Sequence, residues 1–348
     1  MTERLPVLVD PHFRRMDEIF APEDRARLDR IAAVRWGRDE PLPLDEAGAM
    51  LADAVAVICA GWRYGEAALQ QAKNLRAILD VSGSFPQSLD YAECFRRGIR
   101  VLSAAPAFGP QVAEMALGMA LACSRQIVAG DRAMREGSEQ WLHAGNRGTF
   151  QLYGKPVGLI GYGGLARALR PLLAPFGCSI AAYDPWLSDG YLRSQGVEPL
   201  PLGRLLETSR VIFVLATPSA ENRALLSREL LERIRPGSVL VLISRAHVVD
   251  FDALTELVLA GRFLAAIDVF PTEPLPLDHP IRRAPGAVLS AHRAGSVAEG
   301  LWEIGRMVVD DLEAIVRGLP PQRMQRAEPE LVARYATSRV PPPSGQGS

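Results

Sequence analysis

The sequence has few cysteines, no apolar run of membrane-spanning length and no recognisable signal peptide. Only four of its 348 residues are cysteine, and they lie far apart without a C-x-x-C or Cys/His spacing. We therefore expect isolated thiols in a reducing compartment and no bound metal. Without an apolar stretch that could cross a bilayer, the chain is predicted to be cytoplasmic and independent of membranes.

The sequence also lacks an excess of charge of one sign. It contains 39 lysines and arginines against 40 aspartates and glutamates, for a formal net charge of −1, and no block of basic residues. A nucleic-acid partner is therefore not expected. No internal repeat at a fixed period is present, and the length suits two domains better than a single core.

Short runs rich in valine, isoleucine and leucine alternate with helical patterns such as Tyr64–Lys73 and Tyr91–Arg97. This alternation is typical of parallel sheets with crossover helices. The candidate strands of the first third are Leu5–Val9, Ala54–Cys59, Ala77–Val81 and Arg100–Ser103. A second series comprises Val157–Ile160, Ser179–Tyr183, Val211–Leu215, Ser238–Ile243, Phe263–Asp268 and Ala287–Leu289. The pattern predicts an α/β fold of two doubly wound parallel-sheet units.

Three further segments carry predictions about helices and the chain end. Gln111–Arg135 is predicted to form one long helix between the two strand series, either as a connector and dimer element or as a simple core helix. Leu301–Val316 is amphipathic and should pack as a helix. Residues 336–348, rich in proline, glycine and serine, are predicted to be a disordered tail.

The strand Val157–Ile160 runs into a glycine turn and then a helical pattern. Gly161 permits a sharp turn, and Gly163 lets backbone amides at the helix start approach a pyrophosphate. Ala166 takes the third position of a G-x-G-x-x-A motif, where close helix packing needs a small side chain. Asp184 ends the next strand, where a carboxylate binds ribose hydroxyls and repels a 2′-phosphate. The unit predicts a dinucleotide site that favours NAD over NADP.

One residue conflicts with that helical pattern. Pro171 falls inside the expected helix Gly164–Phe176. Because proline removes a backbone hydrogen bond, we expect a kink or an interruption there.

Three candidate reactive side chains follow the ends of predicted strands. Arg245 has the planar donor fork that suits a carboxylate. Glu273 and His292 lie on two such loops and can meet. A carboxylate beside an imidazole stabilises its protonated form and fixes its tautomer, which is what a general acid for carbonyl reduction needs. Taken singly, each of these residues is compatible with a structural role.

The order and spacing of these motifs, over roughly residues 50 to 320, resemble the D-isomer-specific 2-hydroxyacid dehydrogenase family. Further matching segments are Val112–Glu114, Ala216–Leu226 and Val249–Leu254. The resemblance implies a central Rossmann NAD-binding domain over residues 116–297, inserted in a flavodoxin-like substrate domain formed by residues 1–115 and 298–335. It also implies a homodimer that reduces a small 2-keto acid reversibly with NADH.

By the same resemblance, Arg245 orients the substrate carboxylate, Glu273 is the catalytic glutamate and His292 is the acid/base. The implied cofactor contacts are Gly161, Tyr162, Gly163, Gly164, Leu165, Asp184, Ala216, Thr217, Ile243, Ser244, Arg245, Asp268, His292 and Gly295. The implied substrate contacts are Ser82, Gly83, Ser84, Arg245 and His292.

Departures from the family pattern leave the substrate open. Phe85 and Gln87 replace a glycine and an aspartate in the substrate loop, His247 replaces a glycine, Ala291 a proline and Leu215 a histidine. Three arginines of the first domain could meet a second substrate anion, although solvated charges are favoured: Arg63, Arg96 and Arg97.

Two other functions are compatible with the same fold. One is an NAD(H)-sensing, corepressor-like binding protein, since the fold alone does not separate sensor from enzyme. The other is a formate dehydrogenase, which pairs its histidine with a glutamine; Glu273 argues against it.

Overall fold

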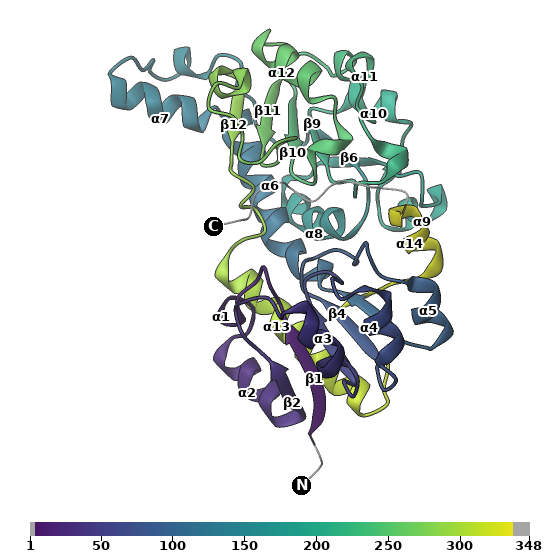
Figure 1. Cartoon of the computed structure of the whole chain (residues 1–348). Helices are drawn as coiled ribbons and strands as arrows, with labels where there is room; N and C mark the ends of the chain where they lie inside the picture. The colour runs from purple at the N-terminus through teal and green to yellow at the C-terminus, as the bar shows by residue number, and fades with distance from the viewer. Residues whose placement is uncertain (1–3, 337–348) are drawn as a thin grey trace. The chain divides into compact units, whose positions relative to one another are not determined.

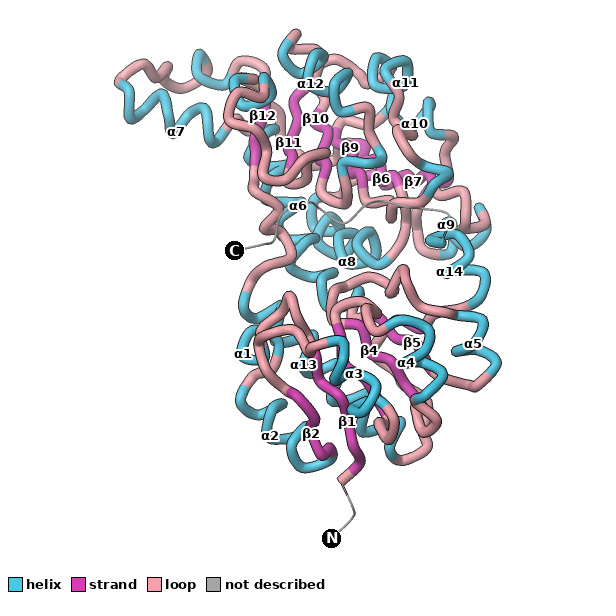
Figure 2. Tube along the Cα trace, in the orientation of Figure 1, coloured by secondary structure: helices cyan, strands magenta, loops and turns pink. Residues whose placement is uncertain are grey.

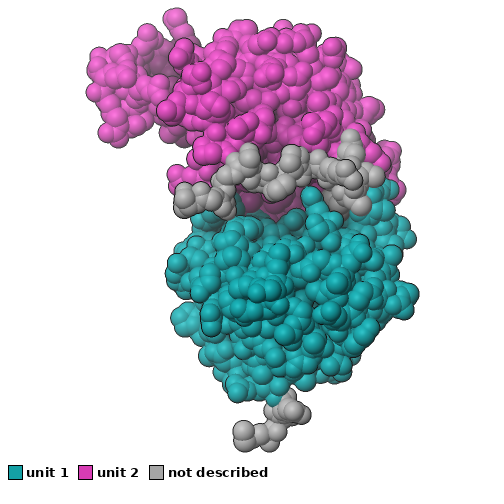
Figure 3. Space-filling model, in the orientation of Figure 1, with its two compact units in different colours: residues 1–108, 295–337 teal, residues 109–294, 338–348 magenta. Residues whose placement is uncertain are grey.

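The computed structural model describes residues 4–336, which divide into two compact units (Figure 3). Unit 1 comprises residues 4–108 and 295–336, and unit 2 comprises residues 109–294. The boundaries expected from the sequence followed residues 115 and 297, whereas those of the structure follow residues 108 and 294. The predicted tail, apart from Ala336 at the end of the last helix, lies outside the described residues.

Unit 1 is built on a six-stranded sheet of order β13-β5-β4-β3-β1-β2 (Figure 2). The strands are β1 (Leu5–Asp10), β2 (Ala32–Trp36), β3 (Ala56–Cys59), β4 (Ala77–Asp80), β5 (Arg100–Ser103) and β13 (Gln325–Arg326). All pair in parallel except β13, which is antiparallel to β5. The first five strands therefore have the flavodoxin-like order 2-1-3-4-5. The predicted strands are confirmed, while β2 and β13 were missed because the first is a half-buried edge strand and the second has two residues.

Helices cover both faces of this sheet (Figure 1). They are α1 (Met16–Ile19), α2 (Pro22–Ile31), α3 (Leu44–Leu51), α4 (Gly65–Gln71), α5 (Tyr91–Arg96), α13 (Ala298–Val316), α14 (Pro329–Ala336) and the 3₁₀ turn η1 (Ala105–Phe108). Alternate strand residues enter two separate cores, one with α2 and α13 and the other with α3, α4 and α5. The expected helix Leu301–Val316 is confirmed as the main part of α13.

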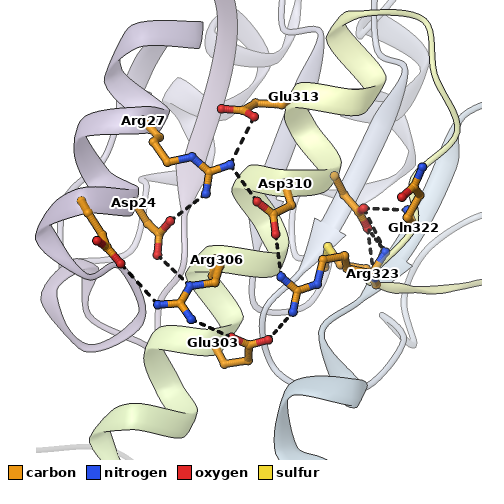
Figure 4. A network of polar contacts seen from close by, with 11 residues as sticks. Asp24, Arg27, Glu303, Arg306, Asp310, Glu313, Gln322 and Arg323 are labelled. Carbon is orange, nitrogen blue, oxygen red and sulfur yellow. Dashed lines mark hydrogen bonds and ion pairs between the residues drawn. The ribbon is translucent and has the colours of Figure 1, made fainter.

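An ion-pair network joins α13 to α2 and to the segment before β13 (Figure 4). Arg27 binds Asp24, Asp310 and Glu313, with its Nη2 2.7 Å from Asp310 Oδ1. These hydrogen bonds, that to Asp310 first, raise the pKa of Arg27. Arg323 binds Asp310 in turn, so shared partners hold α13 and the segment before β13 to α2.

Unit 2 contains a seven-stranded, fully parallel sheet of order β12-β11-β10-β9-β6-β7-β8. The strands are β6 (Pro156–Ile160), β7 (Ser179–Tyr183), β8 (Glu198–Pro199), β9 (Val211–Val214), β10 (Val239–Leu242), β11 (Leu264–Ile267) and β12 (Ala287–Leu289). This is the Rossmann order 3-2-1-4-5-6 with one added strand. The strand order reverses between β6 and β9, and such a reversal is where doubly wound sheets bind ligands.

The helices of unit 2 flank this sheet, except α7, which projects away from it (Figure 1). They are α6 (Gly109–Ser124), α7 (Ile127–Glu136), α8 (Gly164–Leu173), α9 (Asp189–Ser194), α10 (Leu202–Thr208), α11 (Arg228–Glu232) and α12 (Phe251–Leu259). Short 3₁₀ turns are η2 (Ala144–Asn146), η3 (Ala174–Phe176), η4 (Ala220–Asn222), η5 (Ala246–Val248) and η6 (Pro280–Arg283).

The prediction of one helix over Gln111–Arg135 is wrong. The helical pair bends by 56° at a break between α6 and α7, where Gln126 has a left-handed φ of 50°. Burial explains the break, because α6 has eight buried residues and α7 has none. No single helix among the described residues is long and apolar enough to cross a membrane, and α6 with its preceding turn passes that test only together with α7.

Pro171 does not stop α8 at once. The helix continues through it to Leu173 and then tightens into the 3₁₀ turn η3. The expected interruption therefore occurs two residues after the proline.

Candidate active site

The turn between β6 and α8 requires glycine at its first position. Gly161 has a φ of +88°, and a Cβ built on it would lie 2.7 Å from the Cα of Ala216. Its N–H donates to the carbonyl of Tyr183 at 2.9 Å. Both the left-handed backbone and the close approach of the loop after β9 exclude any side chain there.

Gly163 has a different reason to be glycine. It caps the N-terminus of α8, and a Cβ on it would meet no protein atom within 4 Å. Packing within the protein therefore does not require its small size. The open space in front of a helix N-terminus suits an anion, and this fits the pyrophosphate of a dinucleotide. Ala166, by contrast, is fully buried, as expected for the third position of the motif.

Asp184 joins the end of β7 to the glycine turn. Its Oδ2 accepts the N–H of Tyr162 at 2.7 Å, and its Oδ1 accepts the N–H of Trp186 at 2.9 Å. The carboxylate is thereby fixed beside the turn. Because each carboxylate oxygen has two lone pairs, both oxygens retain capacity for a ribose hydroxyl.

Ser244 and His247 both follow the carboxyl end of β10. Ser244 is buried, and its hydroxyl oxygen has no hydrogen-bond partner among residues 4–336. Such an orphaned group fits a site that a polar ligand completes. His247 does not share this character, because its Nε2 contacts the Ser219 carbonyl at 2.9 Å and so supports the neighbouring loop.

Arg245 follows Ser244 in extended backbone at the start of η5. Its Nη1 donates to the Ser244 carbonyl at 2.7 Å, and no other acceptor among the described residues contacts the guanidinium. The arginine is thus anchored through one N–H while the rest of its donor fork is available to a carboxylate.

Glu273 and His292 form a hydrogen-bonded pair. His292 Nδ1 lies 2.6 Å from Glu273 Oε2, and the other glutamate oxygen accepts the N–H of Phe270 at 2.9 Å. The N–H of Phe270 therefore fixes the orientation of the Glu273 carboxylate that contacts the imidazole. His292 is 40% exposed, which leaves its Nε2 edge accessible. The structure brings together the two residues whose pairing the sequence suggested.

Asp268 shapes the loop that carries His292. It is buried, and its carboxylate accepts the N–H groups of Arg293 at 3.1 Å and Ala294 at 3.2 Å. Its carbonyl accepts the N–H of His292 at 2.8 Å, and His292 itself has a φ of 50°. Sequence reasoning predicted Asp268 as a cofactor contact and missed this supporting role, although an aspartate directly after a buried strand was a signal for it.

The predicted substrate loop belongs to unit 1 and is supported by Asp80. This buried carboxylate accepts the N–H groups of Gly61 and Ser82, each at 2.7 Å, and also the Ser82 hydroxyl. Burial raises the pKa of Asp80 to about 6. Ser84 is exposed, with its hydroxyl 3.0 Å from that of Ser82. The sequence did not point to Asp80.

The three arginines considered for a second anion are engaged elsewhere in unit 1. Arg63 binds the carboxylate of Asp10 at 2.7 Å, and Arg96 binds Glu93 at 2.7 Å. Arg97 donates to backbone carbonyls of α4 and its C-terminal end. Each of the three therefore already has an acceptor within unit 1.

Comparison with known proteins identifies the family. Residues 117–294 match the model of the D-isomer specific 2-hydroxyacid dehydrogenase, NAD binding domain. The chain belongs to the D-isomer specific 2-hydroxyacid dehydrogenase family. A hydroxypyruvate reductase of Thermotoga maritima is 32% identical over 70% of this chain and 78% of its own length.

Two further relatives are named for phosphoglycerate. The D-3-phosphoglycerate dehydrogenase of Mycobacterium bovis is 31% identical over 86% of this chain, and the chain spans only 56% of that enzyme's length. The crystal structure of a phosphoglycerate oxidoreductase from Rhizobium etli is 38% identical, with a TM-score of 0.84 over 93% of this chain and 99% of that one. Family membership thus extends over both units.

Proposed function

We propose that this protein is an NAD-dependent D-2-hydroxyacid dehydrogenase that interconverts a small 2-keto acid and its 2-hydroxy acid. The observation that carries the proposal is the 2.6 Å contact between His292 and Glu273 in the same unit as the glycine turn and the available guanidinium of Arg245. A bound nicotinamide supplies the hydride in the reductive direction.

The side chains of the protein bind the substrate and supply the proton. Arg245 holds the substrate carboxylate and the carbonyl oxygen through its free N–H groups. Because Glu273 occupies Nδ1 of His292, Nε2 is the nitrogen that gives a proton to the developing alkoxide. In the Ser82–Ser84 loop, the N–H groups of Ser82 and Ser84 already donate to Asp80 and to the Ser82 hydroxyl, so the N–H of Gly83 is the one that would meet the substrate carboxylate.

Asp184 supports NAD over NADP. Its carboxylate is held at the end of β7 by two backbone N–H groups. A 2′-phosphate beside this fixed negative charge would be repelled, whereas a ribose diol would find acceptors. The buried hydroxyl of Ser244 and the backbone around Ala216, Thr217 and Ile243 would contact the nicotinamide side.

The test is a panel of 2-keto acids with NADH and NADPH. We expect oxidation of NADH by at least one keto acid and slower oxidation of NADPH. Binding of NADH without turnover on any member of the panel would instead support a sensor protein. Formate-dependent reduction of NAD would identify a formate dehydrogenase.

An exposed segment of unit 2, residues 127–142, which we call the arm, supports a homodimer. Five large apolar side chains are exposed within residues 127–142: Ile127, Val128, Met134, Trp141 and Leu142. In Figure 1, α7 projects away from the sheet of its own unit. An apolar surface of this kind on a projecting helix suits a second copy of the chain, because a two-fold interface buries the same patch on both subunits.

We expect the double variant Ile127→Asp, Leu142→Asp to shift the protein from dimer to monomer. Two buried carboxylates per subunit would lack partners in such an interface. Light scattering after size-exclusion chromatography measures the mass. Leu44→Asp is the matched control, since Leu44 is 61% exposed in unit 1. An unchanged mass for the arm variant contradicts this interface.

A further inference from the structure

Arg14 lies at the ligand-binding edge of the sheet in unit 1. It belongs to a turn directly after β1, where its N–H donates to the Pro11 carbonyl at 2.7 Å. The strands β1 and β4 are parallel and separated only by β3, so their carboxyl ends open on one edge. The loop Ser82–Ser84 follows β4 on that same edge, where doubly wound sheets bind ligands.

The guanidinium of Arg14 lies against two aromatic rings and has no ion-pair partner among residues 4–336. Its Cζ lies 5.0 Å from the ring centroid of Phe13 and 5.6 Å from that of Phe108. Its Nε is shielded from solvent and has no hydrogen-bond partner within residues 4–336. Desolvation lowers the pKa of Arg14, while the carboxylates of Glu18 and Asp80 raise it from beyond ion-pair distance. A desolvated cationic donor without an acceptor costs free energy, which a bound anion would recover.

Phe108 connects Arg14 to the substrate loop. A Cβ built on Gly83 would lie 2.5 Å from Cε2 of Phe108, so the loop backbone rests against the same ring that contacts Arg14. The φ of Gly83 is +88°, which also favours glycine. The Phe108 ring therefore contacts both the substrate loop and Arg14.

Asp80 does not accept a hydrogen bond from Arg14. The hydrogen bonds of its carboxylate go to Gly61 and Ser82, which fix the loop. Arg63, Arg96 and Arg97 of unit 1 each have an acceptor. Of these four arginines, only Arg14 has a shielded Nε and no acceptor within the part of the chain that the structure describes.

We propose that Arg14 binds a second anionic group of the substrate, beyond the 2-keto carboxylate, and so selects 2-keto acids that carry a terminal phosphoryl or carboxyl group. This rests on the proposed function, which assigns the Ser82–Ser84 loop to the substrate carboxylate. Arg14 is a specificity-determining residue: it holds the far end of the substrate and takes no part in proton transfer.

The experiment compares matched substrates in the full chain. The phosphoryl pair is 3-phosphohydroxypyruvate and hydroxypyruvate, and the carboxyl pair is 2-oxoglutarate and 2-oxopentanoate. We expect Arg14→Gln to raise KM at least about tenfold for the preferred dianion, because a charge-assisted hydrogen bond is lost, with kcat little changed. The KM of the matched monoanion should stay the same. Which pair shows the effect distinguishes phosphoryl from carboxyl recognition.

Arg38→Gln is the matched control, since Arg38 also stacks on an aromatic ring of unit 1, at 4.5 Å from the centroid of Trp36. It should behave as the wild type. Arg14→Lys should recover part of the dianion preference. Equal changes for the dianion and the monoanion, or no change for either, would overturn the proposal for Arg14 while leaving the proposed reaction intact.

A binding measurement separates the two proposals. Calorimetric titration with inorganic phosphate should show weaker binding to Arg14→Gln than to the wild type. If no keto acid is reduced, the proposed function fails, and this titration still decides the Arg14 site. Identical phosphate binding by both proteins, together with turnover that does not discriminate against monoanions, refutes the anion site.

Discussion

His292→Asn is expected to lower the kcat of keto-acid reduction by about 10²–10⁴-fold, the usual contribution of a positioned general acid. Asparagine can still donate a hydrogen bond to Glu273, but it has no titrating proton to give to the alkoxide. The Kd of NADH should remain close to the wild-type value, because the variant leaves intact Gly163 and Asp184, the residues proposed to hold the pyrophosphate and the ribose. Stopped-flow reduction and fluorescence titration of NADH measure the two quantities separately.

His279→Asn provides a matched control for that substitution. His279 caps the turn η6, with its Nδ1 accepting the N–H of Ile281 at 3.3 Å, and asparagine is a favoured residue at such a cap. Its kcat should therefore equal that of the wild type. Near wild-type reduction by His292→Asn would rule out the imidazole as the proton donor.

Much of the fold could be predicted because parallel strands carry a strong local pattern. The buried strands of both sheets are short continuous apolar runs, as expected for strands covered on two faces. The glycine turn could be predicted equally well, since Gly161 adopts a positive φ and open space lies in front of Gly163. Each of these requirements acts on a few neighbouring residues, so the sequence alone expresses it.

What the sequence could not predict depends on distant contacts. The break at Gln126 follows from where burial of α6 ends, and nothing in the local helical pattern marks that position. Asp80 and Asp268 support their loops through backbone N–H groups, which any sequence would offer. The shielding of Arg14 needs Phe108, which lies more than ninety positions later in the chain.

Arg245→Lys is expected to lower kcat/KM for the keto acid by about 10–150-fold, because a hydrogen bond to a charged group contributes about 1.5–3 kcal/mol. Lysine keeps the positive charge but replaces the planar fork with a single ammonium, so it cannot hold a carboxylate through two parallel N–H groups. Its single nitrogen would have to reach both the Ser244 carbonyl, which now anchors Nη1, and the substrate.

The separation of charge from geometry makes this substitution more informative than removal of the arginine. If Arg245 acts only as a positive charge, the lysine variant should retain nearly full kcat/KM, and the carboxylate-orienting role assigned to it would be wrong. If geometry matters, both kcat and kcat/KM should fall while NADH binding is preserved, because misorientation weakens the contacts of the transition state. Arg283→Lys, at an exposed position of the same unit, should leave all three quantities unchanged. A loss confined to Arg245→Lys would thus assign the substrate's orientation to the guanidinium fork.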